Sequence, residues 1–182
     1  MKKFKIKKIL TVILISLIAA ILAGIYGIIH DHITYAISPE YYTKFKFIQF
    51  DLVNKKDERI VHPRIFVTVV GFLATWWFGL ILGSILGLYN LVQSTWQKMI
   101  FISFKSILIS ILVSFLIGIM GLIFGFLFLS NQPKSSFEGW FIPKDLQNFG
   151  DYIAVGSMHN FGYLGGIIGL IVGIFYSYKK RS

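Results

Sequence analysis

Histidine is the residue best suited to chemistry in this sequence, because its ordinary pKa lies close to neutrality. All four histidines fall near the ends of long apolar runs, and they are His30, His32, His62 and His159. The carboxylates Asp31 and Glu40 are close to the first pair in the sequence. A histidine beside a carboxylate is suited to proton transfer. The pattern therefore predicts an acid–base site made from His30, Asp31, Glu40 and His159.

Two other interpretations of the histidines stay open. The first is a metal site built from His30, His32, His62 and His159, although no HExxH spacing is present and the identity of any cofactor is open. His30 and His32 would chelate together only in an extended segment, because residues i and i+2 do not share a helix face. In the second, the histidines are structural and bind loop backbone and lipid headgroups.

The elements that must position these residues are four apolar runs. A helix that crosses a bilayer needs about 20 mostly apolar residues. The qualifying segments are 9–29, 65–89, 107–130 and 153–178. Continuous apolar runs favour helices over the alternating pattern of a membrane β-barrel. The sequence predicts an all-α fold, an integral membrane four-helix bundle in one domain over residues 1–182, with the first run kept as a span.

Charge predicts how the chain is threaded. The 182 residues carry a formal charge of +10, from 18 Lys and Arg against 8 Asp and Glu. The two tails and the linker between the second and third spans hold ten basic residues and no acidic one. By the positive-inside rule we expect these parts in the cytoplasm, so both termini are cytoplasmic. Topology thus accounts for the charge, and membrane lipid rather than nucleic acid is the expected partner.

The outer loops, 30–64 and 131–152, contain all eight acidic residues. Ser38, Pro39 and Glu40 are typical of a helix start. The apolar residues that follow at helical spacing are Tyr41, Phe45, Ile48 and Leu52. They predict a short amphipathic helix at the membrane interface, with a strand as the alternative. The polar segment 54–59 reads as a turn, and Phe137, Trp140 and Phe141 form an aromatic patch in the second loop.

Small residues recur at helical spacing within the spans. The second span has an unbroken row at every fourth residue, Gly71, Thr75, Gly79, Gly83 and Gly87. The fourth has Gly165, Gly169 and Gly173. Such rows allow close helix packing in a membrane. They favour a compact bundle, and a homo-oligomer or a partner membrane protein is the expected alternative use of these faces.

Three stretches resemble a family of uncharacterised bacterial four-span integral membrane proteins. The segment from His30 to Thr34, followed by Glu40 to Thr43, resembles the family pattern HDxIT…EYFT. Residues 74–80 resemble its ATWWxGL stretch, and His159 with Tyr163, Gly165 and Gly166 resembles a pattern in its last span. This sequence departs from the family at His32 and Tyr42, where a Gln and a Phe are usual. The resemblance implies a bacterial cytoplasmic membrane and supports the site without naming a reaction.

These features lead to three functional hypotheses. The first is a small membrane enzyme that acts on a lipid or lipid-linked substrate at the outer surface. The others are a small transporter or channel, and an accessory subunit of a larger membrane complex. The enzyme hypothesis requires His30 and His159 to lie within about 12 Å of each other, because both must reach one substrate.

Overall fold

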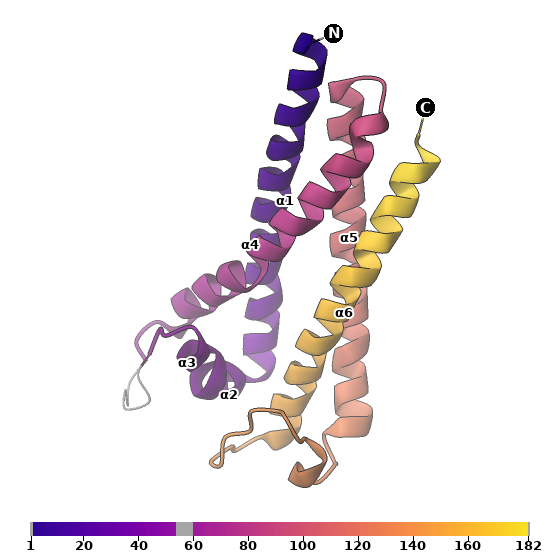
Figure 1. Cartoon of the computed structure of the whole chain (residues 1–182). Coiled ribbons are helices and arrows are strands. Elements are labelled where there is room, and N and C mark those ends of the chain that lie inside the picture. Colours follow the sequence, from indigo (N-terminus) through magenta and orange to yellow (C-terminus); the bar gives the residue numbers. More distant parts are fainter. Residues whose placement is uncertain (1, 54–59, 182) are drawn as a thin grey trace.

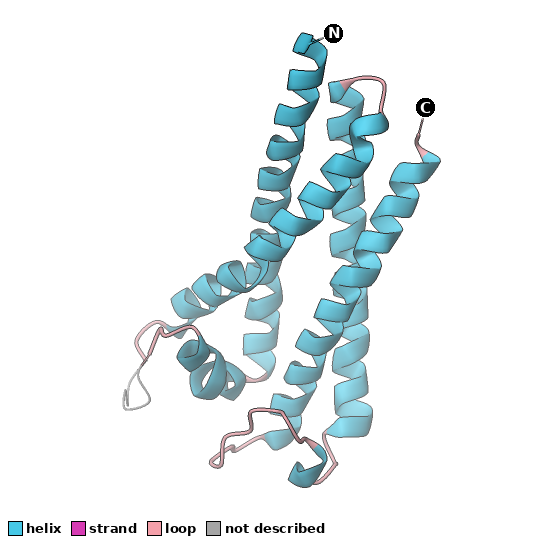
Figure 2. Cartoon of the chain, viewed as in Figure 1, coloured by secondary structure: helices cyan, strands magenta, loops and turns pink. Residues whose placement is uncertain are grey.

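The computed structural model describes residues 2–53 and 60–181. Within these residues the chain is built from helices and contains no strand (Figure 2). The four long helices are α1 (Lys2–Ile37), α4 (Pro63–Tyr89), α5 (Trp96–Phe124) and α6 (Phe149–Lys179). A π-helical segment, η3 (Gly125–Leu129), extends α5. The predicted all-α four-helix bundle is confirmed (Figure 1).

Each long helix is long and apolar enough to cross a membrane. The apolar helical segments are Ile6–Ile37, Pro63–Val92, Trp96–Leu129 and Phe149–Lys179. They cover the four predicted spans except Ser130 and extend each of them, and the third begins at Trp96 instead of residue 107. The Thr95 side chain explains this early start, because it accepts a hydrogen bond from the backbone N–H of Lys98 and caps the helix.

The two ends of the bundle differ in what they carry. Both termini lie at one end, together with the α4–α5 connection that contains η2 (Asn90–Val92) (Figure 1). We call this the terminal end. The segments that join α1 to α4 and α5 to α6 lie at the opposite end, which we call the loop end. Four spans place both termini at the same end of the bundle. Which end faces the cytoplasm stays a prediction from the distribution of charge.

The helices pack as two close pairs, α1 with α4 and α5 with α6, and contacts between the pairs are sparser. The glycine rows lie within the pairs. A Cβ on Gly79 of α4 would lie 2.4 Å from the Ala19 carbonyl oxygen of α1, and one on Gly169 of α6 would lie 2.4 Å from the Ser110 carbonyl oxygen of α5. No larger side chain fits such a contact without a shift of the backbone. The prediction that the rows serve close helix packing is confirmed.

The first loop segment is helical, as predicted. It consists of α2 (Pro39–Tyr41), a π-helical turn η1 (Tyr42–Lys46) and α3 (Phe47–Gln49). The wider π turn shifts the helical phase. Tyr42 and Phe47 are therefore fully buried, whereas Phe45 and Ile48 of the predicted apolar face are only half-buried.

This segment is part of the bundle core at the loop end. Tyr41, Tyr42 and Phe47 belong to one buried cluster with Val67 and Val70 of α4 and with residues of α6. Phe137, which follows the short helix η4 (Lys134–Ser136), completes the cluster from the second loop. The loop end is thus closed by packed aromatic side chains. The predicted turn at 54–59 lies outside the described residues.

Candidate functional site

The site arises where α1 continues past its predicted end. The sequence contains no proline or glycine between Gly27 and Pro39, so nothing stops the helix before Ile37. His30 and Asp31 therefore lie on a helical turn inside the bundle, where they are only 6% and 3% exposed. His159, on the third turn of α6, is 9% exposed.

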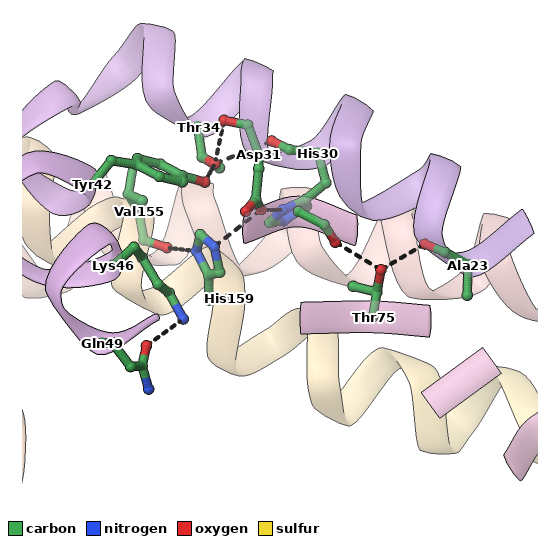
Figure 3. Close-up of polar contacts among 11 residues, drawn as sticks. Ala23, His30, Asp31, Thr34, Tyr42, Lys46, Gln49, Thr75, Val155 and His159 are labelled. Carbon is green, nitrogen blue, oxygen red and sulfur yellow. Dashed lines mark hydrogen bonds and ion pairs between the residues drawn. The ribbon is translucent and has the colours of Figure 1, made fainter. Parts of the chain in front are cut away.

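One carboxylate lies between two imidazoles. Asp31 Oδ1 is 3.0 Å from His30 Nδ1 and 3.5 Å from His159 Nε2 (Figure 3). The two imidazole rings meet edge to face, with their centroids 4.8 Å apart. The structure thus brings together three of the predicted residues, and the distance between His30 and His159 meets the requirement of the enzyme hypothesis. We call His30, Asp31 and His159 the His–Asp–His cluster.

The hydrogen bonds fix where the proton of each neutral ring resides. His159 Nδ1 lies 2.9 Å from the Val155 carbonyl oxygen. A carbonyl only accepts, so Nδ1 donates and Nε2 keeps a lone pair in the neutral ring. Neither His159 Nε2 nor Asp31 Oδ2 has a hydrogen-bond partner among the described residues. His159 Nε2 faces the other carboxylate oxygen, Asp31 Oδ1, at 3.5 Å, and two buried acceptors in this position require a proton or a cation between them.

The hydrogen bond from His30 leaves its second ring nitrogen free to accept a proton. His30 Nδ1 donates to the Asp31 carboxylate, so Nε2 is the acceptor nitrogen of the neutral ring. A carboxylate in this position orients the imidazole and stabilises the imidazolium that forms when Nε2 takes a proton. Thr34 donates to the His30 carbonyl oxygen, and its hydroxyl lies 2.6 Å from the Tyr42 hydroxyl, which fixes this turn against the loop segment. Burial, with the Asp31 charge nearby, raises the pKa of Tyr42 well above its ordinary value, so its hydroxyl stays neutral.

Two pockets lie beside His159 of the cluster. The first, which we call the apolar cleft, runs between the helix pairs toward the terminal end and has a volume of about 770 Å³ including its mouth. His30, Asp31 and His159 line one end of it, and alanine, glycine and larger apolar side chains line most of the rest. The second, the polar pocket, has a volume of about 730 Å³ including its mouth and lies under the two loop segments. His159 and Tyr163 line both pockets.

The structure places Glu40 outside the cluster. Its carboxylate accepts hydrogen bonds from the backbone N–H groups of Gln147 and Asn148 and lies 2.8 Å from Lys44 Nζ. Partial burial alone would raise the pKa of Glu40, but the bond from Lys44 and the two backbone bonds outweigh it and hold that pKa below its ordinary value. Glu40 therefore ties the first loop segment to the second.

His32 and His62 also lie apart from the cluster. Because α1 is helical here, His32 points away from His30 and hydrogen-bonds the Thr68 hydroxyl at 3.0 Å. His62 precedes the first residue of α4 with a left-handed backbone, φ 57°. Among the described residues, the one group of three or more side chains with suitable metal-ligating atoms is His30, Asp31 and His159, whose ligand atoms lie within 4.8 Å of one another.

The most informative residue that the sequence did not single out is Lys46. It is 6% exposed, lines the polar pocket with His159, and donates to Gln49 Oε1 at 3.2 Å (Figure 3). Its only sequence signal is its place among the aromatic residues of 45–50, which reads equally well as a surface lysine. Burial lowers the pKa of Lys46, and the Asp31 charge opposes that effect.

The fold and the site together define a multi-pass membrane protein with a buried His–Asp–His cluster. No protein-family model matches the chain, and no curated protein or solved structure matches it either. The functional conclusion therefore depends on the geometry of the site.

Proposed function

We propose that this protein is a membrane-embedded acid–base enzyme that acts on a lipid or lipid-linked substrate at the loop end. The observation that carries the proposal is the position of the His–Asp–His cluster: all three residues line an apolar cleft within the bundle, and His159 also lines a polar pocket. Buried ionisable groups in a membrane span are costly and are commonly functional. A structural role would leave no reason for two unpaired acceptors beside open pockets.

His30 is the proton acceptor in this proposal. Its Nε2 takes a proton from a substrate hydroxyl or from water, while the Asp31 carboxylate holds Nδ1–H and balances the new positive charge. His159, when protonated at Nε2, is the donor that returns a proton to the leaving group. The two rings are close enough to act on one substrate, and Asp31 contacts both.

The charge distribution supports a location for this chemistry. The terminal end carries ten basic residues and no acidic one, whereas the eight basic residues of the loop end are matched by eight acidic ones, so we infer that the loop end faces outward from a bacterial cytoplasmic membrane. His159 precedes Lys179 by 20 residues of helix, which spans about 30 Å, close to the thickness of a bilayer's hydrocarbon core. The cluster would then lie just inside the outer leaflet, at the level of the upper acyl chains.

The test is lipid conversion by the purified protein. The wild-type protein and the variants His30→Gln and His159→Gln would be reconstituted into nanodiscs of bacterial membrane lipid, and the lipids compared by mass spectrometry over time. We expect a lipid species that declines with wild type and declines about 10²–10⁴-fold more slowly with either variant. His32→Gln is the matched control, because His32 lies on the same helix outside the cluster. A lipid profile that wild type leaves unchanged would overturn the enzyme.

A metal-assisted form of the same reaction is the second candidate. It is favoured by the unpaired Asp31 Oδ2 and His159 Nε2 and by the spacing of the three ligating groups. Two histidines and one carboxylate can hold a zinc or ferrous ion and leave a position open for substrate. Elemental analysis tests it: one equivalent of metal that Asp31→Asn removes and His62→Gln retains would support it. Metal-free wild type that converts lipid would contradict it.

A further inference from the structure

Lys46 is a buried cation with no ion-pair partner among the described residues. Its Nζ donates to Gln49 Oε1, and no carboxylate of the described residues lies within ion-pair distance of it. Lys44 of the same segment, by contrast, has an ionic partner in Glu40. A charge that is buried without an ionic partner is costly to a folded protein. Lys46 therefore has unused capacity for an anion.

Aromatic rings offset only part of this cost. The Lys46 ammonium lies 5.9 Å from the Tyr41 ring centroid, 5.3 Å from Phe45 and 5.9 Å from Phe50. Contacts at this distance attract a cation weakly and use none of its N–H groups. Of the three N–H bonds of the ammonium, one is used by Gln49 and two stay available.

Lys46 and His159 of the cluster line the same polar pocket. Lys46, Gln49 and His159 all line it, together with Asn160 and the backbone at Gly139. In Figure 3 the Lys46 side chain extends from the loop segment to Gln49, with His159 beside it. An anion held at Lys46 therefore lies beside the imidazole that we assign as proton donor.

The apolar cleft continues on the other side of His159. Its lining includes Ala23, Phe78, Ile111 and Gly162, and a Cβ on Gly162 would meet no atom within 4 Å. An intramembrane cleft with this lining fits a hydrocarbon chain, not a water-soluble ligand. One molecule that fills both pockets must carry an anionic head and an apolar tail, joined close to His159.

We infer that the protein binds a phosphate-bearing lipid, with its phosphate at Lys46 and its hydrocarbon chain in the apolar cleft. Phosphate suits the site because a lysine ammonium binds it as a point charge and because the loop end is where headgroups lie. The inference deepens the proposed function by naming the substrate class, and it rests on that function only for what happens after binding.

The binding test uses three probes on the purified protein in neutral detergent micelles. They are dioleoyl phosphatidic acid, dioleoylglycerol, which has the same chains without phosphate, and inorganic phosphate, which has no chain. Dissociation constants come from the rise in unfolding temperature with ligand concentration. We expect phosphatidic acid to bind at least tenfold more tightly than either of the other probes.

Lys46→Met is the decisive variant. Methionine keeps the length of the side chain and removes the charge, so we expect tenfold or weaker binding of phosphatidic acid. The ligand-free protein should unfold at the wild-type temperature or above it, because an unpaired buried charge is gone. A merely structural lysine would instead lower that temperature. Lys134→Met, at an exposed lysine of the loop end, is the matched control and should bind as wild type does. Lys46→Gln repeats the test if the methionine variant does not fold.

Gly162→Leu tests the cleft. The leucine would project into open space and would favour the helix, so the protein stays folded while the chain of the lipid is displaced. We expect weaker binding of phosphatidic acid and unchanged binding of inorganic phosphate.

Three results would overturn the inference: equal affinity for phosphatidic acid and dioleoylglycerol, equal affinity for phosphatidic acid and inorganic phosphate, or wild-type binding by Lys46→Met. Binding needs no turnover, so it can succeed where lipid conversion fails. Failure of the enzyme and failure of the lipid site are therefore distinguishable.

Discussion

Replacing Gly27 with alanine disturbs the helix contact that places the cluster, because Gly27 lies almost one turn before His30 on α1. A Cβ on Gly27 would lie 2.1 Å from the Gly71 carbonyl oxygen and 2.3 Å from Thr75 Oγ1 of α4. Ordinary van der Waals contact begins at 3.4 Å. The two helices would have to separate by roughly 1.3 Å, since a backbone carbonyl cannot rotate away as a side chain can.

The cost of that separation has two unfavourable parts. Thr75 donates to the Ala23 carbonyl oxygen at 2.7 Å, and such bonds between membrane helices contribute on average about 0.6 and at most about 1.7 kcal/mol. Overpacking adds about 1–3 kcal/mol. The higher helix propensity of alanine returns about 1 kcal/mol. We expect Gly27→Ala to lower the free energy of unfolding by roughly 1–4 kcal/mol.

Reversible unfolding in mixed micelles, with sodium dodecyl sulfate as denaturant and far-ultraviolet circular dichroism as the signal, measures this change. Gly162→Ala is the matched control, because its Cβ meets nothing within 4 Å and it gains the same helix propensity. We expect the control to be more stable than wild type by about 1 kcal/mol. Equal stabilities of the two variants would refute the assignment of α1–α4 packing to this contact.

Three further predictions concern parts of the chain outside the cluster. The pKa of Glu40 is held below its ordinary value of 4.5, so the hydrogen bonds of its carboxylate to the second loop stabilise the fold fully above that pH, and this stabilisation is lost as the pH falls through the lowered pKa. Hydrogen exchange at the Gln147 and Asn148 amides should accelerate over that range, and Glu40→Gln should abolish the pH dependence. Asn90 donates to Ser103 Oγ and Ser177 Oγ at 3.0 Å each, so Asn90→Leu should lower the free energy of unfolding by about 1–3 kcal/mol, and an equal loss from Gln132→Leu, at an exposed residue, would contradict this. A reporter that is active only in the cytoplasm should give a signal when fused to either terminus, and a reporter that is active only outside should give a signal when inserted within 131–148. The reverse result would refute the orientation inferred from charge.

Periodicity and composition are sufficient to predict the four helices, because a bilayer imposes one solution on long apolar segments. The glycine rows likewise predict that helices approach closely. They do not predict which helix meets which, since the small residues of α1 would fit the row on α6 as well as the row on α4. The pairing of α1 with α4 depends on contacts such as that of Gly27 with Gly71, and these are known only from the fold.

The candidate site was predictable for three residues and not for the fourth. His30, Asp31 and His159 lie near the loop end of their spans, and a four-span topology brings those ends to one level. Glu40 was predicted to join them because it follows His30 and Asp31 closely in the sequence. The turn at Ser38 and Pro39 instead directs its carboxylate toward Gln147 and Asn148, more than 100 residues away in sequence. No local pattern announces such a partner.

Two groups of buried polar residues in the described part of the chain differ in charge and surroundings, and we expect the reactive group at the loop end. At the terminal end, Asn90 is bonded to serines of α5 and α6, and Gln93 donates to Asn90 Oδ1. These groups carry no charge, and neither lines the apolar cleft or the polar pocket. At the loop end, the cluster carries a carboxylate and lines the apolar cleft, and its His159 also lines the polar pocket. Neutral amides that hydrogen-bond to one another hold helices together, whereas a buried charge beside a pocket is suited to binding a ligand. We therefore expect the ligand to bind at the loop end.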